Sequence, residues 1–228
     1  MSDLTHIRAC LFDAYGTLFD FASAAARCPA VPGDKRAPLT ALWRDKQVQY
    51  SWLRTLQGRY ASFWTVTGDA LDFALESLDL VDPALRERLL SLYLTLDAFP
   101  EVATTLAELK ASGLRLAILS NGSPPMLKAA VVHAGLDALF EGVFSVDAVG
   151  AFKTDSRVYQ YALDELDLRA DEVCFCSSNG RDAYAASAFG MKVAWINRYG
   201  QRQERLPGSP DLMLKTLAEL PARLEPAP

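Results

Sequence analysis

Short apolar runs recur along the chain, separated by stretches in which apolar residues repeat every three or four positions. Such runs, bounded by turn residues, favour buried β-strands, and the longer repeat favours amphipathic helices. We predict strands at Ile7–Phe12, Leu114–Ser120, Gly142–Val146, Val173–Ser177 and Lys192–Ile196. Helical patterns between strands are typical of a parallel sheet covered by helices. The pattern therefore predicts an α/β fold with a Rossmann-like, doubly wound parallel sheet as its core.

Helix signals between the later strands support this interpretation. A helix is predicted from about Pro125 to Ala134. Another begins after Asp155, whose side chain is a good N-cap, and buries Val158, Ala162 and Leu166 on one face.

The interval between the first two predicted strands is long and contains only helical patterns. Asp82 and Pro83 form a good N-cap and first-turn pair, and Pro100 begins a further helix that ends at Gly113. We predict a helical cap domain at residues 19–98, with residues 1–18 and 99–228 forming the α/β core domain. An insertion directly after the first strand would lie above the carboxyl ends of the strands, where such sheets bind ligands, and could act as a lid. Linkers or loose ends are predicted at Ala30–Pro38 and at the tail 224–228.

Bulk properties narrow the class of protein. Half of the 228 residues are hydrophobic and the net charge is -5, so a nucleic-acid or membrane-surface partner is not expected. The sequence contains no apolar stretch of membrane-spanning length and no leader pattern at its start, and we expect a cytoplasmic protein. The cysteines are Cys10, Cys28, Cys174 and Cys176, and we expect reduced thiols, with all but Cys28 in buried strands.

Asp13 is the main candidate for chemistry. It directly follows the first predicted strand, and ligands of open α/β sheets bind just outside the carboxyl ends of the strands. Thr17 can donate its hydroxyl to this carboxylate and fix its orientation. Taken alone, Asp13 before Gly16 is equally typical of a residue that caps a turn.

Four ordered motifs carry a resemblance to a known family: LFDAYGTLF, LRLAILSNG, GAFKTDSRVY and CFCSSNGRD. With the segment LWRDKQVQYSWLRTLQGRY, they make nearly the whole chain similar to the haloacid dehalogenase superfamily, and within it to the L-2-haloacid dehalogenases. The resemblance implies hydrolysis of short-chain L-2-haloacids to D-2-hydroxyacids, with the small haloacid anion, halide and water as the partners of the site.

Two departures from the phosphatases of this superfamily favour the dehalogenase interpretation. The second Asp of the phosphatases is replaced by Tyr15, whose reference pKa of about 10 makes it a poor base near neutrality. One acid of their Mg²⁺-binding motif is replaced by Ser178, so that Asp182 remains alone. We therefore predict a site that uses no metal and no cofactor.

The resemblance also implies roles for catalytic residues. Asp13 would attack C2 and form an ester that water then hydrolyses, and Lys153 would keep this nucleophile ionised. Arg44 would face the departing halide, with Asn121 as its partner in the core. Asp182 would orient Lys153 and position the water, with the support of Ser177 and Asn179.

Further residues are implied to bind the substrate. Ser120 would hold the substrate carboxylate with Thr17, and Tyr15 and Phe63 would form an apolar lining. Tyr159 is a substrate contact or a helix-packing residue. Arg181 stands where the family commonly has a large aromatic residue, and we hypothesise that it restricts long-chain 2-haloalkanoates.

Two other functions remain as alternatives, a superfamily phosphatase for a small ester and a non-catalytic binding protein. A non-catalytic protein would not need to keep all six of the following site residues: Asp13, Thr17, Arg44, Ser120, Lys153 and Asp182. The oligomeric state is also open, because a homodimer is implied by the resemblance but the apolar cap residues can instead pack within one monomer.

Overall fold

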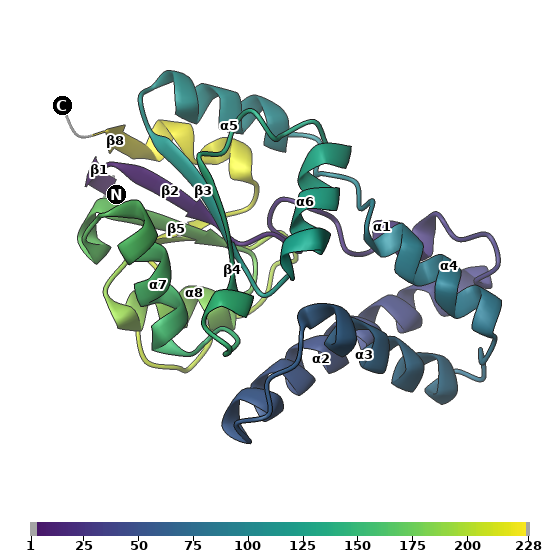
Figure 1. The fold of residues 1–228 in the computed structure, drawn as a ribbon. Helices are drawn as coiled ribbons and strands as arrows, with labels where there is room; N and C mark the ends of the chain where they lie inside the picture. Colours follow the sequence, from purple (N-terminus) through teal and green to yellow (C-terminus); the bar gives the residue numbers. More distant parts are fainter. Residues whose placement is uncertain (1–3, 227–228) are drawn as a thin grey trace.

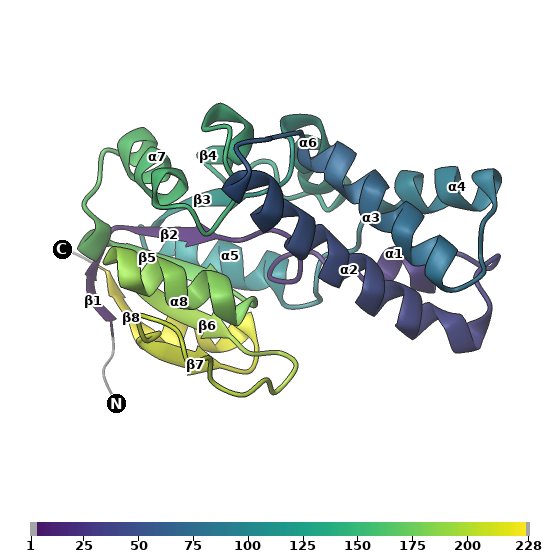
Figure 2. The same ribbon diagram turned by 90° about the horizontal axis from the view of Figure 1, so that it is seen from below.

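The core of the protein is a parallel six-stranded sheet, in a computed structural model that describes residues 4–226. The strand order is β4-β3-β2-β5-β6-β7, and helices α5 and α8 lie on opposite faces of the sheet (Figures 1 and 2). These strands are β2 (Ala9–Phe12), β3 (Arg115–Ser120), β4 (Gly142–Ser145), β5 (Val173–Ser177), β6 (Lys192–Ile196) and β7 (Leu212–Leu214). The predicted α/β class and doubly wound sheet are confirmed.

Helices α1 to α4 form a lobe beside the sheet (Figure 1). They are α1 (Ser23–Ala26), α2 (Gly33–Leu56), α3 (Phe63–Ser77) and α4 (Pro83–Tyr93). Asp20 N–H donates to the Asp97 carbonyl at 2.8 Å, and Phe99 N–H donates to the Leu18 carbonyl at 3.0 Å, so the two connections to the sheet run side by side. Helix α2 extends from the far end of this lobe to the loops at the sheet (Figure 2).

The remaining helices surround the sheet, and the first three of them lie where the sequence predicted helices. They are α5 (Val102–Ala111), α6 (Pro124–His133), α7 (Ser156–Leu166) and α8 (Gly180–Phe189), with short 3₁₀ helices at Val146–Ala148, Ala170–Glu172, Leu217–Glu219 and Pro221–Arg223. Asp155 caps α7, accepting from Arg157 N–H at 3.0 Å, and Asp82 caps α4, accepting from Ala84 N–H at 2.8 Å. Both predicted N-caps are confirmed.

Three predictions about local structure are wrong. The predicted strand Ile7–Phe12 is interrupted at Arg8. Ile7 instead belongs to β1 (Leu4–Ile7), which pairs with β8 (Leu224–Pro226) outside the main sheet, with a register shift at His6, whose φ is 62°. The tail is therefore a strand as far as Pro226, and residues 227–228 lie outside the described part of the chain. Residues 30–38 are not a linker, since α2 begins at Gly33 and the burial of Leu39 and Trp43 outweighs the helix-breaking effect of Pro38.

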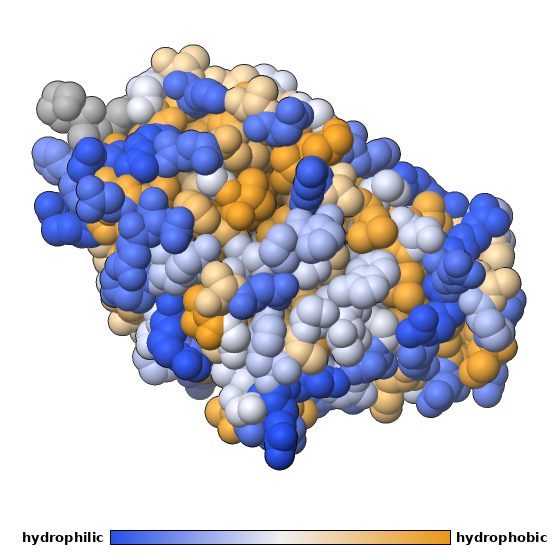
Figure 3. Space-filling view, viewed as in Figure 1, coloured by the Kyte–Doolittle hydropathy of each residue, from blue (hydrophilic) through white to orange (hydrophobic). Residues whose placement is uncertain are grey.

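Polar and apolar positions separate as expected for a globular chain. All four cysteines are free and buried, as predicted for the three that lie in strands. Figure 3 shows hydrophobic residues in small patches among hydrophilic ones on the face viewed. Among residues 4–226, no helix is both long enough and apolar enough to span a membrane.

Candidate active site

Asp13 lies at the carboxyl end of β2 and is held there by two kinds of contact. Its N–H donates to the Cys176 carbonyl at 2.9 Å, and its Oδ2 accepts from Thr17 Oγ1 at 3.1 Å. The Thr17 hydroxyl accepts in turn from Ser178 N–H at 2.8 Å. The turn between them requires Gly16, which has a φ of 93° and no room for a Cβ, since one would lie 2.9 Å from Ser178 Oγ. The carboxylate is therefore fixed at the sheet edge.

Lys153 joins Asp13 to a second carboxylate. Its Nζ lies 3.3 Å from Asp13 Oδ1 and 3.0 Å from Asp182 Oδ2, and all three side chains are buried. The backbone N–H of Lys153 donates to Asn121 Oδ1 at 3.0 Å, and this bond ties the loop after β4 to the end of β3. One ammonium group thus neutralises part of the charge of two carboxylates that have little access to water.

Asp182 lies in the first turn of α8, and its carboxylate accepts hydrogen bonds from Lys153, Ser177 and Tyr159. Ser177 Oγ donates to Oδ2 at 3.1 Å and Tyr159 OH donates to Oδ1 at 2.7 Å. Burial raises the pKa of the Asp182 carboxyl, and the charge of Asp13 acts in the same direction, while Lys153 and Tyr159 oppose the shift. This carboxyl is therefore a candidate proton acceptor.

A small cavity of about 20 Å³ opens onto these groups, with room for about one water molecule. It is lined by Asp13, Tyr15, Arg44, Val48, Trp52, Phe63, Ser120, Asn121, Lys153, Thr154, Asn179 and Asp182. The ring of Tyr15 stacks on Phe63 with centroids 5.9 Å apart. The buried Tyr15 hydroxyl has no hydrogen-bond partner among the described residues, and burial raises the pKa of Tyr15 well above its ordinary value. We call this space the inner cavity.

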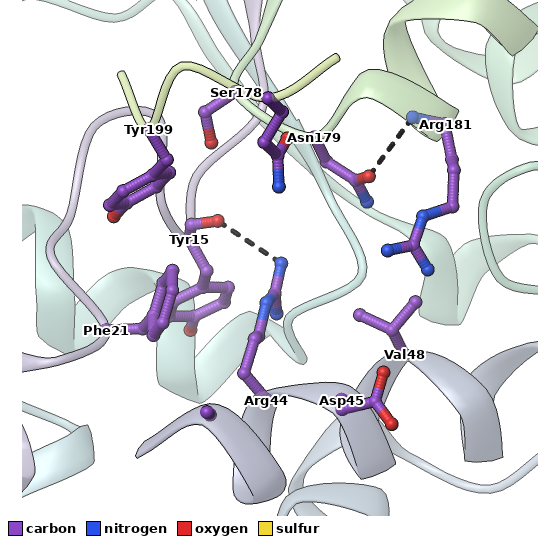
Figure 4. Close-up of a pocket in the computed structure, with 11 residues that line it drawn as sticks. Tyr15, Phe21, Arg44, Asp45, Val48, Ser178, Asn179, Arg181 and Tyr199 are labelled. Atoms are coloured by element: carbon purple, nitrogen blue, oxygen red, sulfur yellow. Dashed lines mark hydrogen bonds between the residues drawn. The ribbon is translucent and has the colours of Figure 1, made fainter. Parts of the chain in front are cut away.

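A larger hollow of about 230 Å³, which we call the vestibule, shares Tyr15, Arg44, Val48 and Asn179 with the inner cavity. Figure 4 shows Arg44 reaching into the vestibule from α2 and Arg181 from α8. Arg44 Nη2 donates to the Tyr15 carbonyl at 3.3 Å, and Asn179 Oδ1 accepts from Arg181 N–H at 3.2 Å as the N-cap of α8. Two guanidinium groups therefore border the entrance, which favours an anion.

Most of the residues singled out from the sequence come together here. The inner cavity is lined by Asp13, Tyr15, Arg44, Phe63, Ser120, Asn121, Lys153, Asn179 and Asp182, while Thr17 and Ser177 hold Asp13 and Asp182 from behind. Tyr159 does not reach the inner cavity, because it lies behind Asp182 and packs on Phe175 and Phe189. Arg181 lines the vestibule instead of the inner cavity.

Sequence reasoning missed three lining residues, Val48, Trp52 and Thr154. A signal for the first two was present, because Val48 and Trp52 follow Arg44 at intervals of four residues and so share one face of α2. Thr154 directly follows the predicted site residue Lys153 in the sequence. Within the described part of the chain, no group of three or more His, Cys, Asp or Glu side chains is arranged to hold a metal ion.

Comparison with known proteins places the chain in a family. It is 47% identical over 219 residues to (S)-2-haloacid dehalogenase 1 of Pseudomonas sp. (strain CBS-3), with 96% of each chain covered. A solved dehalogenase with an intermediate complex matches at a TM-score of 0.94 and 42% identity, covering 98% of this chain and 99% of that one.

A second solved relative is the L-2-haloacid dehalogenase of Xanthobacter autotrophicus with chloropropionic acid covalently bound. It matches at a TM-score of 0.88 and 40% identity, covering 95% of this chain and 97% of that one. The family model for haloacid dehalogenase-like hydrolases matches residues 7–190. The strand-end carboxylate, the lysine beside it and these matches agree, and the chain belongs to the haloacid dehalogenase-like hydrolases.

Proposed function

We propose that this protein is a hydrolase of carbon–halide bonds that converts short-chain L-2-haloacids to D-2-hydroxyacids without a metal ion. The observation that carries the proposal is the Asp13 carboxylate, which faces the inner cavity between Thr17 and Lys153. It is supported by relatives named (S)-2-haloacid dehalogenase and by the solved relative that holds chloropropionic acid covalently.

In the first step, a carboxylate oxygen of Asp13 attacks C2 of the haloacid from the side opposite the halogen. The new carbon–oxygen bond forms as the carbon–halogen bond breaks, and the halide leaves with the bonding electron pair. Because C2 is inverted once, the L-acid yields the D-configuration. Lys153 keeps Asp13 ionised for this attack, and Arg44 and Asn121 stabilise the charge that develops on the halide.

In the second step, water adds to the side-chain carbonyl carbon of Asp13. The tetrahedral intermediate then expels the 2-hydroxyacid, whose new hydroxyl takes a proton, and the Asp13 carboxylate is restored. Asp182 accepts the proton from the attacking water, and Ser177 and Tyr159 hold Asp182 in position. Asn179 supports the same loop by capping α8, and its N–H donates to Ser177 Oγ at 3.2 Å.

The substrate is held by groups that match its two ends. Ser120, at the end of β3, binds the substrate carboxylate with the help of nearby N–H groups. Tyr15 and Phe63 supply the apolar side of the inner cavity, which excludes bulk water until the ester forms.

The division of the chain into an inserted helical domain and a core domain supports a lid function for the helical lobe. We propose residues 19–98 as the cap domain, and residues 1–18 with 99–228 as the core domain. Arg44, Val48, Trp52 and Phe63 come from the cap side of the inner cavity, so that the site is complete only when both domains meet.

We further propose a homodimer in the cytoplasm. Leu53 and Leu56 on α2 are exposed by 45% and 83%, which is unfavourable for apolar side chains that face water together. The four free thiols fit a reducing compartment. Sedimentation analysis tests the dimer, and a Leu56→Glu variant should shift the equilibrium toward monomer if this face is buried.

A paired assay tests the catalytic proposal. Halide release from L- and D-2-chloropropionate is measured with a chelator present, and phosphate release from p-nitrophenyl phosphate is measured with Mg²⁺ added. We expect halide from the L-acid alone and no phosphate. Phosphate release without halide would instead favour a superfamily phosphatase, and no turnover in either assay would favour a non-catalytic binding protein.

A further inference from the structure

A second hollow, of about 670 Å³, lies on the outside of the core next to the inner cavity. Its walls are mainly apolar and come from α7, α8 and the loop before β7, with Tyr159, Ala185, Ala188, Phe189, Leu206 and Pro207 among them. We call this hollow the outer groove. The vestibule differs from it, since Arg44, Asp45 and Asn179 place charged and polar groups on the vestibule wall.

Only a thin wall separates the outer groove from the inner cavity. Trp52 and Thr154 line both spaces, so the same two side chains face the catalytic carboxylates on one side and the apolar groove on the other. Trp52 belongs to α2 and Thr154 follows Lys153 in the core. The wall therefore runs along the boundary between the helical lobe and the sheet.

Arg181 holds this wall in place from the core side. Its guanidinium lies 5.1 Å from the centroid of the Trp52 ring, and its Nε lies 3.7 Å from Glu204 Oε1. Both members of the Arg181–Glu204 ion pair are partly exposed, at 42% and 36%, so this pair contributes little free energy and does not lock Arg181 against Trp52. Arg181 lines the vestibule and the groove but not the inner cavity.

The size of the inner cavity requires this boundary to move. Room for about one water molecule does not admit any 2-haloacid, so the side chains around Asp13 must separate when substrate binds. Arg44, Val48 and Trp52 occupy one face of α2, and a shift of this helix moves all three. Trp52 on this face also contacts Arg181 and lines both spaces, so its displacement from Arg181 would connect the inner cavity to the outer groove.

We propose that the outer groove is a subsite for the C2 side chain of 2-haloacids longer than 2-halopropionate, and that the Arg181–Trp52 contact is the gate to it. This inference rests on the proposed function. The charged carboxylate and halide stay at Ser120, Asn121 and Arg44, while an alkyl chain gains by leaving water for an apolar surface. With the gate closed, Arg181 restricts the enzyme to short chains.

The test is the ratio of kcat/KM for L-2-bromooctanoate to kcat/KM for L-2-bromopropionate, measured as bromide release. Arg181→Ala removes the contact with Trp52 and should raise the ratio roughly fivefold, the size expected for an exposed cation–π contact. Leu206→Asp in the Arg181→Ala background places a charge in the groove and should reverse that gain. Ala188→Phe, which fills the groove from α8, is a second blocking variant that should do the same.

The control variant is Val132→Asp, which makes the same kind of change at an exposed valine on α6, far from the groove in sequence, and should leave the ratio unchanged. An unchanged ratio in Arg181→Ala overturns the gate, and a raised ratio that survives both blocking variants overturns the groove as the subsite. No bromide from L-2-bromopropionate with the wild-type protein refutes the proposed function instead, so the two failures are distinguishable.

Discussion

Two ion pairs in this molecule both lie within hydrogen-bond distance but in different surroundings. Lys153 Nζ is 3.0 Å from Asp182 Oδ2 in the core, and in the helical lobe Arg86 contacts Asp72 twice, through Nε at 2.5 Å and Nη2 at 3.0 Å. The side chains of the first pair are each 4% exposed, and those of the second are 41% and 42% exposed. The shorter contact belongs to the exposed pair, so burial and not distance separates the two pairs.

The difference indicates what each pair contributes. Water screens the Arg86–Asp72 pair, which joins α4 to α3 and adds little free energy. The buried group costs desolvation energy that a well-packed apolar cluster would avoid, and it leaves Asp13 and Asp182 close to each other beside one cation. An arrangement that is costly for stability and faces a cavity is better explained by chemistry. The following changes test this contrast.

Asp13→Asn should give the largest effect. An amide does not form the ester with C2, so halide release should fall below detection, while the neutral side chain removes a buried charge and leaves the fold intact. Activity and thermal unfolding are measured together, with Asp137→Asn at an exposed position as the matched control. Halide release at the wild-type rate would remove Asp13 from the mechanism.

Lys153→Met should lower both activity and stability. The change leaves the carboxylates of Asp13 and Asp182 buried without their cation, and breaking a buried pair in this way costs about 3–5 kcal/mol. Chemical denaturation gives the free energy of unfolding, and Lys128→Met, at an exposed position on α6, is the control. A loss in Lys153→Met no larger than in the control would show that the group is well solvated.

Much of the buried core and of its charged centre could be predicted from the sequence. The buried strands Val173–Ser177 and Lys192–Ile196 have the predicted bounds, because continuous apolar runs between turn residues have few alternative structures. Asp13 was placed at the sheet edge because it follows a predicted strand, whereas Lys153 and Asp182 were placed beside it by resemblance. The core follows from local pattern, and its polar centre follows from the position of Asp13 together with the resemblance.

The remaining features depend on tertiary packing. Pro38 indicated a break, but contacts between α2 and α3 keep the helix intact. Tyr159 was assigned to substrate or packing, and only the folded chain places its hydroxyl behind Asp182. The short strand β7, Leu212–Leu214, has too few residues for a pattern, and Trp52 was missed because its role depends on how the helical lobe meets the core.

Asp182→Asn should change the pH dependence of stability by a smaller amount. In the folded protein the pKa of Asp182 is raised, chiefly by burial, so the native state binds more protons than the unfolded chain at pH values between the ordinary and the raised pKa. Its contribution to stability is therefore present below the ordinary value and is lost as the pH rises through the raised one. Melting temperatures from about pH 4 to 7 should vary less in Asp182→Asn than in the wild type. An equal variation in both proteins would mean that the Asp182 pKa is not raised.

Asp72→Asn should have the smallest effect, between zero and about 1 kcal/mol in the free energy of unfolding, because both partners are about two-fifths exposed. Dehalogenase activity should not change, since α3 and α4 contact each other at this pair and the inner cavity lies elsewhere. Denaturation in low and high salt separates the two kinds of pair further, as screening weakens an exposed pair and leaves a buried one nearly unaffected. If Asp72→Asn cost as much as Lys153→Met, burial would not distinguish them, and the argument that the buried group is kept for catalysis would lose its energetic basis.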